Sequence, residues 1–299
     1  MAARPHDAPR RGATEHYIDR QTGDVVTEQL FGDRIVRWLY SDVREHAPSV
    51  FRAATGKRVS AALAWLNFDS PLAPLLVGNR GFLKRCGVDL RECFDPPESY
   101  TTPRALFERR IRYWDFRPLP VDKDCVASPA DARVQVGSLS RDALLYIKRA
   151  AFDLETLVGT DRTDLHALFG QGDAAIFRLT PERYHYTHVP VAGRVVDTFE
   201  LDGAYHACHP VAALEVATPI SRNRRVVTVF DTDVPRGTQV GRVAMVEVVA
   251  MMIGRVEPRY SDHRYDAPRP LAVGDFAERG AVMSLFRPGS STVVLLFEP

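Results

Sequence analysis

The pattern of hydrophobic positions along the chain changes near residue 118. Before that point apolar residues recur at the spacing of amphipathic helices. Beyond it, short runs rich in Val, Ile and Phe, several of them separated by turns with Gly and Pro, predict strands. The predicted helices are residues 31–43, 58–67, 81–85, 105–111 and 142–157, and the predicted strands are 133–136, 175–179, 194–199, 225–230, 240–249 and 293–297.

This change of pattern predicts an α+β protein with two domains. A small helical N-terminal domain, residues 26–118, is followed by a compact β-rich domain of short, mainly antiparallel strands, residues 119–299. Thr102 followed by Pro103 is typical of a helix start and supports the helix predicted just after it. Residues 1–25 are predicted to be a mobile leader, because charge, Pro and Gly dominate there without periodicity.

Composition narrows the class of protein. With 45% apolar and 26% charged residues among 299, the chain has the make-up of a globular protein with ample material for a core. The 39 basic and 38 acidic side chains nearly cancel, so no bulk field attracts nucleic acid and no nucleic-acid partner is expected. The four cysteines form no CxxC pair, which favours a reducing, cytoplasmic location.

A membrane-spanning helix is not predicted. The most apolar stretch, residues 59–77, is interrupted by polar residues and by Pro71 and Pro74. The predicted helix 31–43 carries Trp38 on its apolar side and arginines elsewhere, which also suits a peripheral helix at a membrane surface. Packing of that apolar side against the following domain is the simpler interpretation, and a peripheral membrane contact stays open.

Two stretches in the middle of the chain could carry acid–base chemistry. Asp131 lies in a Ser-Pro-Ala-Asp turn before a predicted strand, where a carboxylate also commonly bonds nearby backbone amides. His185 and His188 stand three apart among aromatic residues, and such positions face opposite sides of a regular strand. Both can reach one site only if the chain bends before Pro190. A catalytic pair, a metal pair and two structural polar residues are all open interpretations.

A third cluster contains His206, Cys208 and His209. Together with His185 and His188 it could supply a His-rich zinc site. The spacing matches no named zinc motif and no HExxH is present, so no metal site is predicted.

The apolar, β-branched run 293–297 predicts a buried strand with an unusual entrance. Gly289, Ser290, Ser291 and Thr292 come directly before it, so small residues place a hydroxyl at the mouth of the strand.

These stretches, taken in order, resemble the pyruvoyl-dependent phosphatidylserine decarboxylase family. The resemblance spans about residues 107–297 and is specific because four separate segments fall in the family's order. The segments are the Ser-Pro-Ala-Asp turn at 128–131, residues 176–193 with both histidines, residues 223–232, and Gly-Ser-Ser-Thr with the apolar run at 289–297.

The resemblance implies a role for each candidate residue. Ser291 attacks the peptide bond after Ser290 and becomes the pyruvoyl cofactor. His188 is the base that activates this serine, Asp131 orients His188, and His185 acts in decarboxylation as proton donor. Such a division is chemically reasonable, because a serine hydroxyl is a weak nucleophile until an oriented imidazole takes its proton.

The same resemblance implies the reaction. The pyruvoyl ketone forms a Schiff base with the substrate amine and accepts the electrons released on decarboxylation. The family's substrate is phosphatidylserine, which gives phosphatidylethanolamine in phospholipid biosynthesis. A soluble decarboxylase of a free amino acid and an unprocessed, non-catalytic scaffold are the alternatives. Self-cleavage leaves residues 291–299 as a separate peptide partner, and a homodimer stays open.

The chain departs from the family's pattern at two positions. Ser290 stands where Gly usually precedes the reactive serine, so cleavage is expected to be slower, and two adjacent serines leave the scissile bond open by one residue. Ala132 stands where the acidic turn commonly has Gly, which puts the turn geometry in question.

Overall fold

Seven antiparallel strands form the main sheet of the protein. The computed structural model describes residues 16–27, 88–139, 145–147, 150–152, 154–180, 182–204, 219–249, 255–288 and 291–299, with isolated positions between 46 and 70. The strand order is β12-β8-β9-β10-β14-β6-β3, which makes β14 an interior strand. All six predicted strands are confirmed and belong to this sheet. The bounds are β3 Arg133–Ser138, β6 Asp173–Leu179, β8 Gly193–Leu201, β9 Arg225–Asp231, β10 Arg242–Val248, β12 Phe276–Ala277 and β14 Ser291–Phe297.

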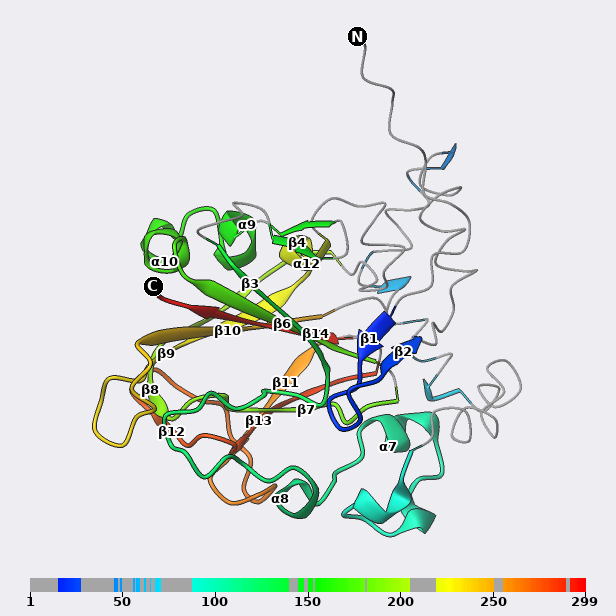
Figure 1. Cartoon of the computed structure of the whole chain (residues 1–299). Helices are drawn as coiled ribbons and strands as arrows, with labels where there is room; N and C mark the ends of the chain where they lie inside the picture. Colours follow the sequence, from blue (N-terminus) through cyan, green and yellow to red (C-terminus); the bar gives the residue numbers. More distant parts are fainter. Residues whose placement is uncertain are drawn as a thin grey trace.

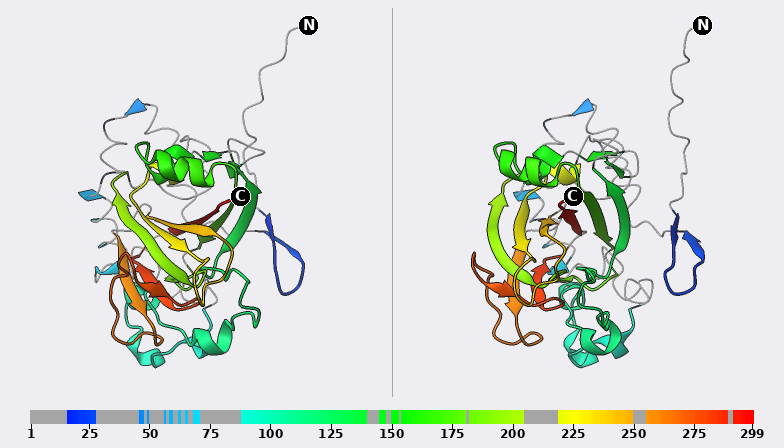
Figure 2. Two further views of the ribbon diagram at one scale, coloured as in Figure 1. Left: turned by 90° about the vertical axis from the view of Figure 1, so that its left-hand side faces the viewer. Right: turned by 60° about the vertical axis from the view of Figure 1, so that its left-hand side comes forward.

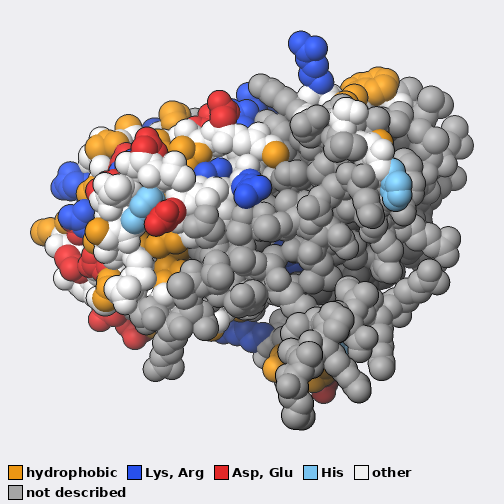
Figure 3. All heavy atoms as spheres, turned by 90° about the horizontal axis from the view of Figure 1, so that it is seen from above, with side chains coloured by type: hydrophobic (Ala, Val, Ile, Leu, Met, Phe, Trp, Pro, Cys, Tyr) orange, Lys and Arg blue, Asp and Glu red, His pale blue; other side chains and the backbone are white. Residues whose placement is uncertain are grey.

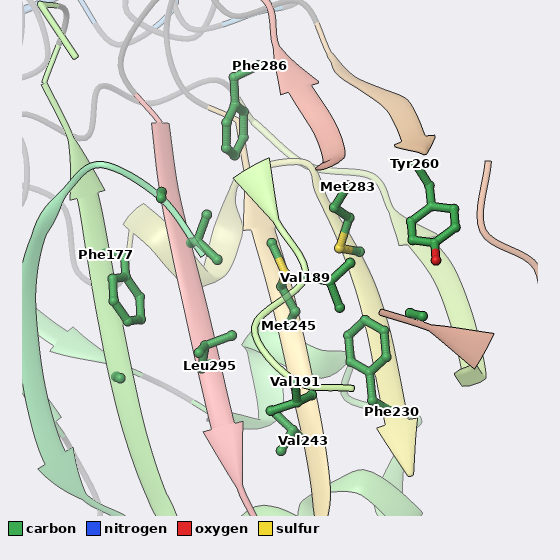
Figure 4. Close-up of a cluster of buried hydrophobic side chains, with 14 of the residues drawn as sticks. Phe177, Val189, Val191, Phe230, Val243, Met245, Tyr260, Met283, Phe286 and Leu295 are labelled. Atoms are coloured by element: carbon green, nitrogen blue, oxygen red, sulfur yellow. The ribbon is translucent and has the colours of Figure 1, made fainter. Parts of the chain in front are cut away.

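A smaller sheet packs against one face of the main sheet, as Figure 1 shows. Its strands have the order β11-β13-β7 and are antiparallel. Buried side chains from the two sheets meet in one cluster, called the inner cluster below. Figure 4 draws part of it, and the residues labelled there point toward one another: Phe177, Val189, Val191, Phe230, Val243, Met245, Tyr260, Met283, Phe286 and Leu295. The bounds are β7 Tyr186–His188, β11 Val256–Ser261 and β13 Val282–Phe286.

Short helices cover the opposite face of the main sheet. Figure 2 shows α9 and α10 above the curved sheet. Their buried side chains Leu157, Val158, Leu165 and Phe169 meet side chains of the sheet in a second cluster, called the helix-side cluster below. Val293 and Leu295 of β14 point into the inner cluster, and Val294 and Leu296 into the helix-side cluster. The continuous apolar run of β14 follows from this burial on both faces. The bounds are α9 Leu154–Val158, α10 Thr163–Phe169 and α12 Pro219–Arg222.

The helix predicted at 142–157 is wrong at residues 145–147 and 150–152 and right at 154–157, among the positions that the structure describes. The structure has a short hairpin of β4, Leu145–Ile147, and β5, Ala150–Phe152, followed by helix α9. Short apolar runs fit a buried strand as well as a helix turn, so periodicity alone cannot separate the two.

Two further helices and two 3-10 turns lie near the outer face of the small sheet. Helix α7, Pro103–Phe107, starts as predicted, with the Thr102 hydroxyl accepting the backbone N–H of Ala105 at 3.1 Å. It ends earlier than residue 111, and Ile111 instead forms a bridge with Cys93 and packs in an outer cluster with small-sheet residues. The bounds of the others are η2 Leu90–Glu92, η3 Pro97–Ser99 and α8 Tyr113–Phe116.

The predicted N-terminal helical domain is described only in part. A hairpin of β1, His16–Ile18, and β2, Val25–Thr27, stands where an irregular leader is predicted. The predicted helices 31–43 and 81–85 lie outside the described residues, whereas the described positions 58, 59, 62 and 65 are helical. In the view from above (Figure 3), the described side chains mix acidic, basic and apolar types.

Candidate active site

Ser291 is the first residue of β14 and is completely buried. It pairs with Leu179 of β6, a member of the inner cluster, so its side chain is directed to the inner face of the main sheet. Among the described residues, its Oγ has no hydrogen-bond partner. A buried hydroxyl left without a partner costs about 1–3 kcal/mol, so its presence calls for an explanation such as chemistry at that atom. Ser290 lies outside the described residues.

His185 is another buried candidate residue with an atom that has no hydrogen-bond partner among the described residues. A turn closed by Arg183 N–H and Thr180 O at 2.9 Å reverses the chain after β6 and leads to His185. The imidazole Nδ1 donates to the Arg183 carbonyl at 2.7 Å, which leaves Nε2 as a free acceptor without a partner. Its ring stacks on Phe107 with centroids 3.6 Å apart. Burial, with Arg109 nearby, lowers the pKa of His185 to about 3, so the ring is neutral at neutral pH.

His188 ends strand β7 and is held through both ring nitrogens. Nδ1 donates to the Gly280 carbonyl at 2.9 Å, and Nε2 lies 3.1 Å from the Tyr184 hydroxyl. The Tyr113 ring packs edge-on against it with centroids 4.5 Å apart. Burial lowers the pKa of His188 to about 4, and the Gly280 hydrogen bond offsets part of that effect. The ring is therefore a neutral base with its lone pair on Nε2.

The Tyr184 hydroxyl can donate its proton either to His188 or to a second tyrosine. The Tyr184 hydroxyl also lies 2.8 Å from the Tyr265 hydroxyl, which itself donates to the Ile111 carbonyl at 2.7 Å. Tyr184 thus has one proton for two acceptors. When that proton goes to Tyr265, Nε2 of His188 is available to another donor.

Asp131 lies in the predicted turn, directly before β3. Its carboxylate forms ion pairs with Arg117 at 3.0 Å and Arg183 at 3.9 Å. The main chain of the same turn reaches β7, because the His188 N–H donates to the Pro129 carbonyl at 2.8 Å. The turn and the histidine strand are therefore adjacent, while the carboxylate binds the two guanidinium groups.

The structure brings the predicted residues together only in part. Thr187, between the two histidine-bearing positions, points toward the main sheet, whereas His188 packs with Tyr184 on the outer side of the small sheet. The turn and bend at residues 182–183 come before His185, and residues 186–188 are extended strand β7, so they are not the bend between the two histidines that one shared site would need. Among the hydrogen bonds of the described residues, none joins Ser291 to Asp131, His185 or His188.

Several residues near the site were not predicted from the sequence. They are Phe107, which stacks on His185, the Gly280 carbonyl, Tyr184, and the buried Glu247. Only Glu247 carried a visible signal, as a lone acidic residue within an apolar strand. The others depend on contacts between segments far apart in the chain.

Neither a metal-binding cluster nor a membrane-spanning helix is present among the residues that the structure describes. Within them, no three His, Cys, Asp or Glu side chains gather to hold a metal ion, and no helix has the length and apolarity needed to span a bilayer. The cluster of His206, Cys208 and His209 lies outside the described residues.

Comparisons with known proteins cover all four candidate residues. The family model described as phosphatidylserine decarboxylase matches residues 104–299. A phosphatidylserine decarboxylase proenzyme of Bordetella petrii is 32% identical over 73% of this chain and 76% of its own length. Proenzymes of the same name from Shewanella frigidimarina and Chlamydia trachomatis are 32% and 27% identical over 72% and 95% of the chain, and 76% and 87% of their own lengths. The chain belongs to the phosphatidylserine decarboxylase family.

Proposed function

We propose that this protein is a self-processing, pyruvoyl-dependent decarboxylase that converts phosphatidylserine to phosphatidylethanolamine. The observation that carries the proposal is the buried hydroxyl of Ser291, without a partner at the start of an interior strand. Family membership and the proenzyme name of the relatives support the same function.

Self-cleavage begins at Ser291. Its Oγ attacks the carbonyl carbon of Ser290, the peptide C–N bond breaks, an ester forms, and the freed amine of residue 291 takes up a proton. His188 is the proposed base for the hydroxyl proton, because burial keeps its ring neutral and its Nδ1 is already fixed by Gly280. For this transfer, Nε2 must exchange the Tyr184 hydroxyl for that of Ser291.

The residues around Ser291 fit a pyruvoyl group. In a pyruvoyl group the ketone takes the place of the amide nitrogen of residue 291, and the side chain becomes a methyl group because the hydroxyl oxygen leaves with the new carboxyl end of Ser290. A methyl group needs no hydrogen-bond partner, which suits a buried side chain whose Oγ has none among the described residues. The group supplies an electrophilic carbonyl that accepts electrons during decarboxylation. Nε2 of His185 is a free site that can hold a proton and return it to substrate carbon.

Asp131 is proposed to assist through the position of the turn and its carboxylate. The backbone bond between His188 and Pro129 fixes the turn against β7. Orientation of the imidazole by the carboxylate requires that Asp131 leave its ion pair with Arg117, which is only partly buried and therefore inexpensive to break.

Intact-mass measurement tests the proposal. The expressed chain is expected to give two masses split between residues 290 and 291, the smaller with a ketone at its amino end. Ser291→Ala is expected to stay whole, whereas the matched control Ser290→Ala is expected to cleave. A wild-type chain that stays whole under folding conditions contradicts self-processing and favours a non-catalytic scaffold.

A substrate assay tests the lipid assignment. The processed protein is expected to release carbon dioxide from phosphatidylserine vesicles and to float with them as a peripheral protein. Turnover of free serine without turnover or binding of vesicles would instead identify a soluble amino-acid decarboxylase.

A further inference from the structure

Glu247 is a buried acid that the proposed chemistry does not use. It lies in β10, is 2% exposed, and is the only acidic residue of that strand. Its Oε1 lies 2.8 Å from the Thr187 hydroxyl and also contacts the Ser284 hydroxyl. The two hydroxyls are themselves 2.7 Å apart. One carboxyl group thus connects β10 of the main sheet to both β7 and β13 of the small sheet.

The register places this group beside the start of β14. Glu247 is the antiparallel partner of Val293, and partners in such a pair point to the same face of the sheet. Ser291 stands two positions along β14 and therefore shares that inner face. On the other side of the contact, Thr187 directly precedes His188.

The contacts among Oε1 of Glu247 and the hydroxyl oxygens of Thr187 and Ser284 need three hydrogens if each contact is a hydrogen bond. Three short contacts join Glu247, Thr187 and Ser284, but the two hydroxyls supply only two protons. A protonated carboxyl supplies the third, and each contact then has its own hydrogen. Burial raises the pKa of Glu247 to about 7, although both hydroxyls lower it in part.

No charged group faces Glu247 from the neighbouring strands. Its partners across the strands are Val226 of β9 and Val293 of β14, and the small sheet presents Thr187 of β7 and Ser284 of β13. Its protonation is thus governed by burial and by these two hydroxyls.

Stability by itself does not account for an acid at this place. Burial of a polar group has a free-energy cost, and apolar replacements of buried polar networks are often neutral or stabilising. Directional hydrogen bonds, in contrast, fix one relative position of two packed layers. Here the layers are the sheet that carries Ser291 and the strand that carries His188.

We propose that Glu247, in its protonated form, is a positioning residue for self-cleavage, because it clamps strand β7, which ends at His188, against the start of β14. The inference rests on the proposed self-processing at Ser291. Thr187 and Ser284 are the two other members of this clamp, and neither touches the reacting atoms.

The rate of self-cleavage of newly translated chains, followed by intact mass, tests the clamp. Glu247→Gln keeps the shape, the neutral charge and a donor, so at pH 6.5 it is expected to cleave within about threefold of wild type. Glu247→Leu is expected to cleave at least tenfold more slowly, and Thr187→Val provides a second loss-of-clamp variant if Glu247→Leu does not fold.

The pH profile separates positioning from a merely structural role. Between pH 6.5 and 8.5 the wild-type rate is expected to fall at least fivefold relative to Glu247→Gln, because only the wild-type carboxyl ionises. A flat ratio, or wild-type rates in Glu247→Leu, would overturn the inference while leaving self-processing intact. Cleavage of wild type together with none in Ser291→Ala shows that the underlying reaction is present, so the two failures are distinguishable.

Discussion

The lowered pKa values of His185 and His188 predict that acid destabilises the fold with a defined slope. Folding lowers the pKa of His185 from 6.5 to about 3 and that of His188 to about 4. Through these two histidines the unfolded chain binds nearly two more protons than the folded chain near pH 5 to 5.5. Their contribution to stability is present above pH 6.5 and is lost as the pH falls toward the folded pKa values.

Glu247 acts in the opposite direction over the same window. Folding raises its pKa from 4.5 to about 7, so its contribution is present below pH 4.5 and is lost as the pH rises through 7. Each proton changes the free energy of unfolding by about 1.4 kcal/mol per pH unit. Near pH 5.5 the two histidines raise the free energy of unfolding with increasing pH, and Glu247 offsets the effect of one of them. The net rise in the free energy of unfolding is therefore about 1.4 kcal/mol per pH unit.

Urea unfolding of the uncleaved Ser291→Ala chain between pH 5 and 6 measures this slope. Adding His188→Gln is expected to bring the slope near zero, and adding Glu247→Gln is expected to raise it to about 3 kcal/mol per unit. The exposed His263→Gln serves as the control and is expected to keep the parent slope. An unchanged slope in His188→Gln would refute a buried neutral imidazole at this position.

Three further substitutions test other parts of the structure. Asp131→Asn is expected to slow self-cleavage at least tenfold, measured by intact mass, whereas Arg117→Gln is not. If both substitutions slow it equally, the ion pair and not the carboxylate alone supports self-cleavage. Gly280→Ala is expected to destabilise the protein by roughly 1–3 kcal/mol in urea, because its φ is 81° and a Cβ would collide with Leu119; wild-type stability would contradict this geometry. Leu295→Ala, fully buried in the inner cluster, is expected to lose about 2–5 kcal/mol by the same measurement, and a loss under 1 kcal/mol would show that the core refills the space.

The sequence pattern was sufficient for six of the seven strands of the main sheet, all except β12, and for one helix start. Runs of Val, Ile and Leu predict strands because their residues are buried, and β14 is apolar without alternation because both of its faces are covered. Thr102 and Pro103 predict the start of α7 because a cap acts within a few residues. The same local reasoning failed at 145–152, where a short apolar run does not distinguish a strand from a helix turn.

The sequence by itself singled out the candidate residues Ser291, His185, His188 and Asp131, because each stands in a recognisable local setting. Only the tertiary structure decided their protonation and their partners. His188 meets Gly280 across 92 positions and Thr187 meets Glu247 across 60, and burial by the surrounding layers sets the pKa values. The physical reason is that desolvation and hydrogen bonding depend on packing among distant segments, which local pattern does not encode.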